Sequence, residues 1–405
     1  MHLGIWLLTA MLGASAEVND SVLHSADYGE LLDTGGSDVQ LWWCDAPRKI
    51  SRGRPAPSAK GQAVRLQAAG GEFEAAQVVV RPRRALSGLT AAVEGLRGPA
   101  GVIAASNIQV LRVRYVPVRV PTDAVGVADE WPDPLPPLDR PIDVPVDVNQ
   151  PLWVLVHVPE SAAGGDYEGR IRLSAGGWSA SVPIRLHVWD FALPKQPHTQ
   201  SAFGLGVNNV WRYQGLTDEA QRRTVWAKYM QCFADHRISP FDPTPFDHYE
   251  IKPVPNATPP KVDINWTRFD SAMQEAIDRW HITSFNLRIP GMGWGSYEAR
   301  REGEIAGFKA GTPQHEAMFA SAARQIEEHL RQKGWLDKAY IYWFDEPEPR
   351  DYDFVRKGMD RLKKYAPALC RMLTEEPTEP LFGAVDLWCP VSPAYDHQIA
   401  ESRRK

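Results

Sequence analysis

The chain has 405 residues, a formal net charge of −5 and a pI of about 6.1. A slightly acidic protein of this length has no basic footprint for nucleic acid, and it is long enough for roughly two or three domains. Its four cysteines form no CxxC pair, which argues against zinc and dithiol motifs. The pairs Asp235-His236 and Asp247-His248 do not have a recognised metal-ligand spacing. We therefore expect neither a metal nor another cofactor.

A leader is expected at the N-terminus. Residues 5–12 form an apolar run that is too short to span a bilayer, and residues 14–16 (ASA) form an A-x-A cleavage pattern. Residues 1–16 are therefore predicted to be a secretory signal peptide, which would make the protein secreted or periplasmic. No later segment has the length and apolarity of a membrane span.

Residues 17–195 have the pattern of a β domain. Short runs rich in β-branched and aromatic residues recur between glycine-rich turns. The expected strands are residues 73–80, 108–120, 153–158, 171–173 and 182–188. Because no long helical periodicity interrupts these runs, the segment is predicted to be an N-terminal β-sandwich.

Strand and helix signals alternate from residue 196 onward, as in βα units that build a parallel sheet. Helices are expected after Thr217 and Thr312, because threonine is a good N-cap residue. The expected strands are residues 201–206, 238–244, 283–290, 339–345, 371–374 and 384–389. A closed barrel of this type needs eight units. Residues 196–405 are therefore predicted to be a (β/α)8 TIM-type barrel that is truncated after about six strands.

Two adjacent carboxylates follow the most apolar of these strands. Residues 339–344 (AYIYWF) lead directly into Asp345 and Glu346, and Pro347 ends the run. Parallel strands of a barrel carry their chemistry at their C-terminal ends. Two neighbouring carboxylates suit acid–base work, because one of them should hold its proton more tightly, and glycoside hydrolysis uses carboxylates in this way. The alternative is an Asp that caps the next helix beside a solvated Glu.

Aromatic and polar residues near the strand ends are candidates for contacts with a sugar. Four aromatic side chains could stack on the C–H faces of a sugar ring, namely Trp294, Tyr297, Trp343 and Trp388. Trp343 lies inside a predicted strand, so ordinary packing is the alternative for it. Asn286 and Arg288 could form hydrogen bonds with sugar hydroxyl groups.

The chain resembles glycoside hydrolase family 123, and the related secreted proteins that combine a sandwich with a barrel, in the order of several short motifs. The matching stretches are residues 71–77 (GEFEAAQ), 131–135 (WPDPL), 163–169 (AGGDYEG), 188–194 (VWDFALP) and 345–347 (DEP). Each stretch is weakly specific by itself. Together they extend over nearly the whole chain, and their order carries the resemblance.

The resemblance implies an N-terminal β-sandwich, a (β/α)8 barrel, usually a small C-terminal β domain, and a glycan substrate. It also implies a retaining β-N-acetylgalactosaminidase in which the acetamido group of the substrate is the nucleophile. Asp345 would then orient the acetamido group, and Glu346 would protonate the leaving oxygen and later deprotonate water. Two alternatives stay open: a retaining glycosidase with a protein nucleophile on a later strand, and a non-catalytic carbohydrate-binding protein. The sequence does not indicate an oligomeric state.

Overall fold

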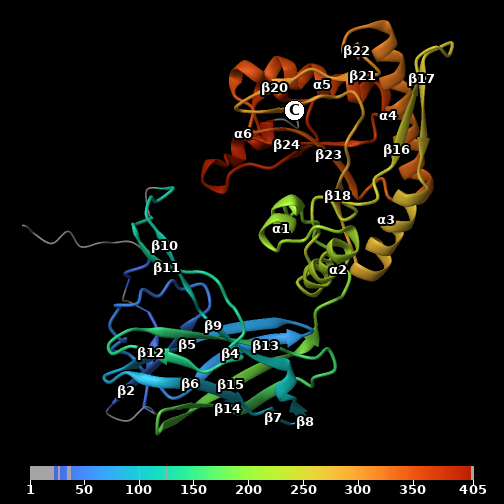
Figure 1. The fold of residues 1–405 in the computed structure, drawn as a ribbon. Coiled ribbons are helices and arrows are strands. Elements are labelled where there is room, and N and C mark those ends of the chain that lie inside the picture. Colours follow the sequence, from blue (N-terminus) through green and yellow to red (C-terminus); the bar gives the residue numbers. More distant parts are fainter. Residues whose placement is uncertain (1–21, 26–27, 34–37, 100, 124–125, 403–405) are drawn as a thin grey trace, which may run out of the picture. The chain divides into compact units, whose positions relative to one another are not determined.

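The computed structural model describes residues 22–25, 28–33, 38–99, 101–123 and 126–402. The predicted signal peptide, residues 1–16, lies outside these ranges. The chain divides into two compact units, Met1–Pro194 and Lys195–Lys405, which run from blue to green and from green to red in Figure 1. The expectation of a multidomain chain rich in β-structure is confirmed.

Two sheets and a separate hairpin make up the first unit. The six-stranded sheet has the order β3-β1-β2-β5-β13-β9, with β1 (Glu30–Leu32), β2 (Val39–Asp45), β3 (Lys60–Gly61), β5 (Phe73–Pro82), β9 (Ile108–Arg112) and β13 (Gln150–His157). The seven-stranded sheet consists of β4 (Val64–Gly70), β6 (Leu86–Val93), β7 (Leu96–Gly98), β8 (Gly101–Ile103), β12 (Ile142–Val144), β14 (Gly165–Ala175) and β15 (Trp178–Ala192). The hairpin pairs β10 (Tyr115–Val118) with β11 (Asp129–Pro132).

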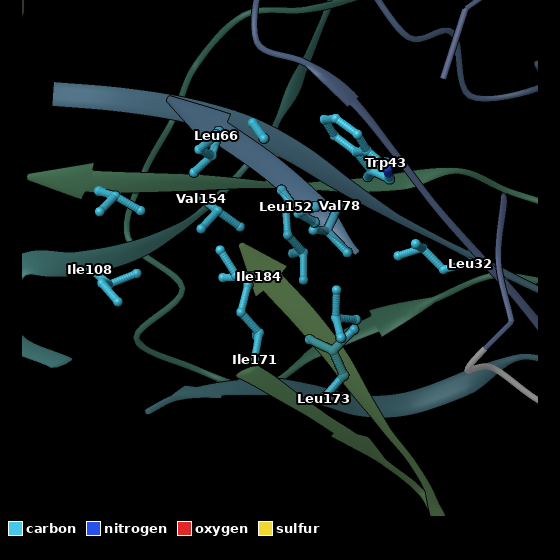
Figure 2. Close-up of a cluster of buried hydrophobic side chains, with 14 of the residues drawn as sticks. Leu32, Trp43, Leu66, Val78, Ile108, Leu152, Val154, Ile171, Leu173 and Ile184 are labelled. Atoms are coloured by element: carbon cyan, nitrogen blue, oxygen red, sulfur yellow. The ribbon is translucent and has the colours of Figure 1, made fainter. Parts of the chain in front are cut away.

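Both sheets contribute side chains to one hydrophobic core. Figure 2 shows Leu152 and Val154 of β13 meeting Ile171 of β14 and Ile184 of β15 between the strands. On β14, buried and exposed residues alternate along much of the strand, which is the period of a sheet with one covered face. Burying a Leu or Ile side chain of this kind contributes about 1.5–3 kcal/mol.

The strands of the first unit follow the sequence pattern in part. Strands β5 and β13 cover the predicted residues 73–80 and 153–158 closely. The single strand predicted over residues 108–120 is wrong, because the chain divides there into β9 and β10. Val113 and Arg114 separate the two, and the carbonyl of Val113 accepts a hydrogen bond from the side chain of Gln150, at 3.0 Å from Nε2.

The second unit contains helices that mostly begin and end where the local signals place them. The α-helices are α1 (Val207–Tyr213), α2 (Glu219–Asp235), α3 (Thr267–Trp280), α4 (Pro313–Lys333), α5 (Tyr352–Tyr365) and α6 (His397–Ser402). Thr312 caps α4 as predicted, with its side chain accepting from His315 N. The cap of α2 is Asp218 and not Thr217, because the Asp218 carboxylate accepts from Gln221 N.

The main sheet of the second unit is built around β23 (Ala339–Asp345). β18 (Phe285–Asn286) and β19 (Trp294–Ser296) both pair with β23 in parallel. β24 (Cys370–Thr374) pairs with β23 in parallel as well, and β25 (Leu387–Trp388) pairs with β24. Short antiparallel strands complete the unit, namely β16 (Glu250–Val254), β17 (Lys261–Asn265), β20 (Arg300–Arg301), β21 (Glu304–Ile305) and β22 (Phe308–Lys309).

Two further segments extend this row of parallel pairs. Phe203 forms a parallel bridge with Pro240, and Asn286 N donates to Phe241 O at 2.8 Å. Each of the six predicted strand regions but the last is therefore hydrogen-bonded to the region that follows it along the chain. The strands predicted over 201–206 and 238–244 are reduced to a bridge, and Pro240 and Pro243 have no N–H for a ladder. Within residues 195–402 the sheet does not close, so the (β/α)8 barrel stays a prediction.

Candidate active site

Strand β23 is a covered parallel strand that carries Asp345 at its last position. Ile341 and Phe344 pack with side chains of α4 and α5 in one core and are almost fully buried. The apolar run therefore forms the buried strand that its pattern indicates. Asp345 is half-buried and Glu346 is exposed, so both carboxylates lie where the strand leaves the core.

A β-bulge sets the direction of the Asp345 side chain. Tyr342 pairs with Met372 and Asp345 pairs with Thr374, so β23 has one residue more than β24 between the two pairs. In a regular strand, side chains at positions 342 and 345 would point to opposite faces. The extra residue changes this alternation, and both side chains reach one hydrogen-bonding network. Glu346 follows with a φ of 45° and turns the chain away from the strand.

Two hydroxyl groups hold one oxygen of Asp345. Tyr342 Oη donates to Asp345 Oδ1, and Thr374 Oγ1 donates to the same atom at 3.0 Å. Burial and then the bond to Asp345 raise the pKa of Tyr342, so the phenol keeps its proton at neutral pH. Thr374 Oγ1 also accepts from Glu346 N at 3.0 Å. In the described part of the chain no hydrogen bond reaches Asp345 Oδ2, which leaves this oxygen for a ligand.

Tyr297 lies beside the two carboxylates on a neighbouring loop. Its backbone N–H donates to Asp345 O at 3.1 Å, and Arg350 Nη2 donates to its carbonyl oxygen at 2.7 Å. The charge of Glu298 is the main cause that raises the pKa of the Tyr297 phenol, and Glu346 and Asp345 contribute as well. The exposed Tyr297 ring is therefore within electrostatic range of the predicted catalytic pair.

A third carboxylate follows the next strand. Glu375 comes directly after β24, and Tyr352 Oη donates to its Oε1 at 2.9 Å. Burial is the largest cause that raises the pKa of Glu375, and the charges of Glu376 and Glu346 add to it. Glu375 is therefore close enough to Glu346 for their charges to interact.

A cavity of about 910 Å³ opens among the segments that precede and include β23. Its lining is largely apolar and aromatic, which is typical of small-molecule sites. The polar lining residues include Asn208, Asp242, His248, Asn286 and Arg288. Asp345 and Glu346 do not line this cavity, but Tyr342 does and donates to Asp345.

The other predicted sugar-binding residues fall into two groups. Trp294 lines the cavity and is 51% exposed, which leaves a ring face for stacking. Asn286 lines it too, but its Oδ1 accepts from Tyr342 N at 3.0 Å and thereby replaces a ladder bond of β23. Trp343 also lines the cavity, but its ring stacks on Phe354 of α5, at 5.3 Å between centroids.

Trp388 makes a packing contact as well. Its ring meets Phe382 edge-on at 6.2 Å between centroids, and Trp388 does not line the cavity. The structure therefore brings Asp345, Glu346 and Tyr297 together. It leaves Trp388 apart from them.

The hydroxyl groups around Asp345 were not predicted from the sequence, and neither was a second polar pair, which lies in the cavity. His248 Nε2 lies 2.7 Å from Asp242 Oδ2, and Thr244 N donates to Asp242 Oδ1 at 3.0 Å. The hydrogen bond with Asp242 is the main cause that raises the pKa of His248. A signal was present, because Asp242 stands near the C-terminal end of the predicted strand 238–244, as Asp345 does on its own strand.

Two properties of the described residues concern ions and membranes. Among them no group of three or more His, Cys, Asp or Glu side chains is arranged to hold a metal ion. No helix in the same part of the chain has the length and apolarity to cross a membrane.

Comparisons with known proteins agree with the resemblance seen in the motifs. Residues 43–175 match the glycoside hydrolase 123 N-terminal domain. Through this domain the chain is related to glycoside hydrolase family 123. No curated protein matches the sequence at a significant level.

One solved structure has a similar fold, and two others align with low scores. A family 123 glycoside hydrolase from Clostridium perfringens, described in a study of glycolipid glycan hydrolysis, aligns with a TM-score of 0.59 and 14% identity. The alignment covers 85% of this chain and 67% of that chain. A glycosyl hydrolase family 2 member from Bacteroides cellulosilyticus aligns with a TM-score of only 0.24, at 8% identity, over 90% of this chain and 38% of that one. The CooA pilin subunit of enterotoxigenic Escherichia coli scores 0.20 at 14% identity, over 39% of this chain and 99% of that one.

Proposed function

We propose that this protein is a retaining β-N-acetylgalactosaminidase that uses the 2-acetamido group of its substrate as nucleophile. Asp345 carries the proposal: Tyr342 and Thr374 hold one of its oxygens, and the other is left for an N–H of the substrate. Glu346 is the next residue and is exposed at the end of the same strand. The relation to glycoside hydrolase family 123 supports this choice of chemistry.

In the first step Glu346, as a carboxylic acid, gives its proton to the glycosidic oxygen while the bond from C1 to that oxygen breaks. Asp345 Oδ2 accepts a hydrogen bond from the acetamido N–H and stabilises the positive charge that develops there. The acetamido carbonyl oxygen bonds to C1, which gives an oxazolinium ion, and the alcohol leaves. No protein nucleophile about 5 Å across the site is then needed.

In the second step Glu346, now a carboxylate, takes a proton from water. The water oxygen bonds to C1 on the face that the leaving group occupied, and the bond from C1 to the acetamido oxygen breaks. Two displacements at C1 retain its configuration. Glu346 is again a carboxylic acid, so the cycle can repeat.

The alternative with a protein nucleophile would need a third carboxylate close to Glu346. Glu375 is the carboxylate that follows the adjacent strand. Tyr352 Oη donates to its Oε1 at 2.9 Å. The comparison of substrates below distinguishes this carboxylate from the acetamido group as the nucleophile.

The experiment compares aryl β-glycosides of N-acetylgalactosamine, N-acetylglucosamine, galactose and glucose. Hydrolysis of an acetamido sugar, with retention at C1 in the product first formed and inhibition by a thiazoline analogue of the intermediate, is expected. Hydrolysis of plain hexosides without such inhibition would indicate a protein nucleophile. Saccharide binding without turnover of any of the four would indicate a non-catalytic carbohydrate-binding protein.

Export is part of the same proposal. The motif over residues 14–16 supports cleavage after Ala16. Mass spectrometry of the protein recovered from the periplasm or the medium should find a chain that begins at Glu17. An uncleaved chain in the cytoplasm would contradict this part.

A further inference from the structure

We propose that Arg288 and His248 form a site for an anionic substituent of the glycan, a sulfate ester or a carboxylate, on the wall of the cavity. The inference rests on the proposed function, since it concerns the glycan that this enzyme would act on. It adds a substrate class, namely acidic glycans, to the proposed reaction.

Arg288 presents a cationic side chain without a protein partner. It lines the cavity and is exposed. Within the described residues its guanidinium group makes no hydrogen bond or ion pair. Several other arginines of this unit form ion pairs, as Arg223 and Arg268 do with Asp247. An unpaired guanidinium in a concave site offers a planar fork of donors that matches the two oxygens of a carboxylate or sulfate.

The backbone that carries Arg288 is fixed independently of the guanidinium group. Tyr249 Oη donates to Arg288 O. The preceding Leu287 N donates to Tyr340 O at 2.9 Å. Both bonds are made by groups that a substitution of the Arg288 side chain would leave in place, so the role of the charge can be tested alone.

His248 adds a second donor on the same wall. Asp242 occupies its Nε2 at 2.7 Å, so the protonated ring presents Nδ1–H as the remaining donor. His248 and Arg288 line the same cavity.

Neighbouring carboxylates do not cancel the charge of Arg288. Asp242 is hydrogen-bonded to His248 Nε2 and to the backbone N–H of Thr244, and both contacts stabilise its charge. The charge of Asp247 also reaches His248, but two arginines already neutralise Asp247. Arg288, Arg223 and Arg268 together outnumber the carboxylates of Asp242 and Asp247. The net charge of these side chains is therefore positive, which favours an anion over a neutral hydroxyl group.

The test measures binding by calorimetry, with N-acetylgalactosamine, its 4-sulfate, its 6-sulfate and its disaccharide with a uronic acid. The proteins are the wild type, Arg288→Met, Arg288→Lys, His248→Gln and the control Arg279→Met. Arg279 is an exposed arginine paired with Glu275 on α3, outside the cavity. The sulfated sugars and the uronic acid disaccharide separate the two sources of negative charge.

At least one anionic ligand should bind the wild type about tenfold more tightly than the neutral sugar, as expected for charge-assisted hydrogen bonds. Arg288→Met should lose this preference and keep its affinity for the neutral sugar. His248→Gln and Arg288→Lys should lose part of it, and Arg279→Met none.

Equal binding of neutral and anionic sugars by the wild type would overturn the inference. So would an Arg288→Met variant that weakens both equally, because Arg288 would then contact sugar hydroxyl groups. If neutral acetamido sugars are hydrolysed without any anion preference, the proposed function stands and this inference alone fails. Anion preference without hydrolysis of any glycoside would leave the site in place and remove the proposed function. If no saccharide binds, both fail.

Discussion

The hydroxyl group of Thr374 is hydrogen-bonded to the side chain of Asp345 and to the backbone of Glu346. It donates to Asp345 Oδ1 and accepts from Glu346 N, each at 3.0 Å. One side chain of β24 thereby orients a carboxylate and the backbone of the next residue on β23. The pair is therefore held by the neighbouring strand as well as by its own.

Thr374→Val should lower kcat by about tenfold or more and leave KM nearly unchanged. Valine has a similar shape but removes a hydrogen bond to a charged group, which is worth roughly 1.5–3 kcal/mol. Steady-state kinetics on an acetamido glycoside measures the effect. Thr374→Ser keeps the hydroxyl group and should retain most of the rate. Equal loss in both variants would point to packing and not to the hydrogen bonds.

Glu346→Gln should lower kcat by about 10²–10⁴-fold on a substrate with a poor leaving group, because general acid–base catalysis contributes that much. Glu346 is exposed, so the melting temperature should not change. Glu275→Gln on α3, another exposed glutamate, is the matched control. A Glu346→Gln enzyme with the wild-type rate would remove this residue from the mechanism.

Asp345→Asn should slow acetamido substrates chiefly in kcat. The proposed role of Asp345 is to stabilise charge that develops in the transition state, and such interactions appear in kcat. Tyr342 and Thr374 can still donate to the amide oxygen, so the fold should persist. A change in KM alone would show that Asp345 only binds the substrate.

Trp294→Ala should raise KM by about threefold to tenfold with little effect on stability. The ring lines the cavity with one exposed face, and an aromatic contact is worth about 0.5–1.5 kcal/mol. Trp388→Ala should behave in the opposite way, because that ring packs on Phe382. We expect it to lower the melting temperature and leave KM unchanged. Kinetics and thermal melting of both variants separate binding from packing.

Glu375→Gln should gain stability relative to the wild type as the pH rises. Burial raises the pKa of Glu375 above its ordinary value of 4.5. Its favourable contribution to folding is therefore complete below the unfolded pKa and is lost as the pH rises through the folded pKa. Glutamine cannot ionise, so it avoids this loss. The difference in melting temperature, variant minus wild type, should increase between about pH 4 and pH 7. A difference that stays constant over this range would contradict the raised pKa.

Local patterns in the sequence determined much of the second unit and the position of its candidate site. The apolar run over residues 339–344 predicts a covered strand, and β23 is that strand. Thr312 and Gly334 mark the ends of α4 because capping chemistry depends only on adjacent residues. The motif order predicts the relation to glycoside hydrolase family 123, which the match over residues 43–175 confirms.

Only the tertiary structure decided how the side chains at that position meet. The alternation of a regular strand places Tyr342 and Asp345 on opposite faces, and the bulge against β24 brings them together. Thr374 follows them by about thirty residues, and its contact depends on the register between two strands. A sequence pattern reports the period of one segment. It does not report the register between segments, and that register is what joins Thr374 to Asp345 and Glu346.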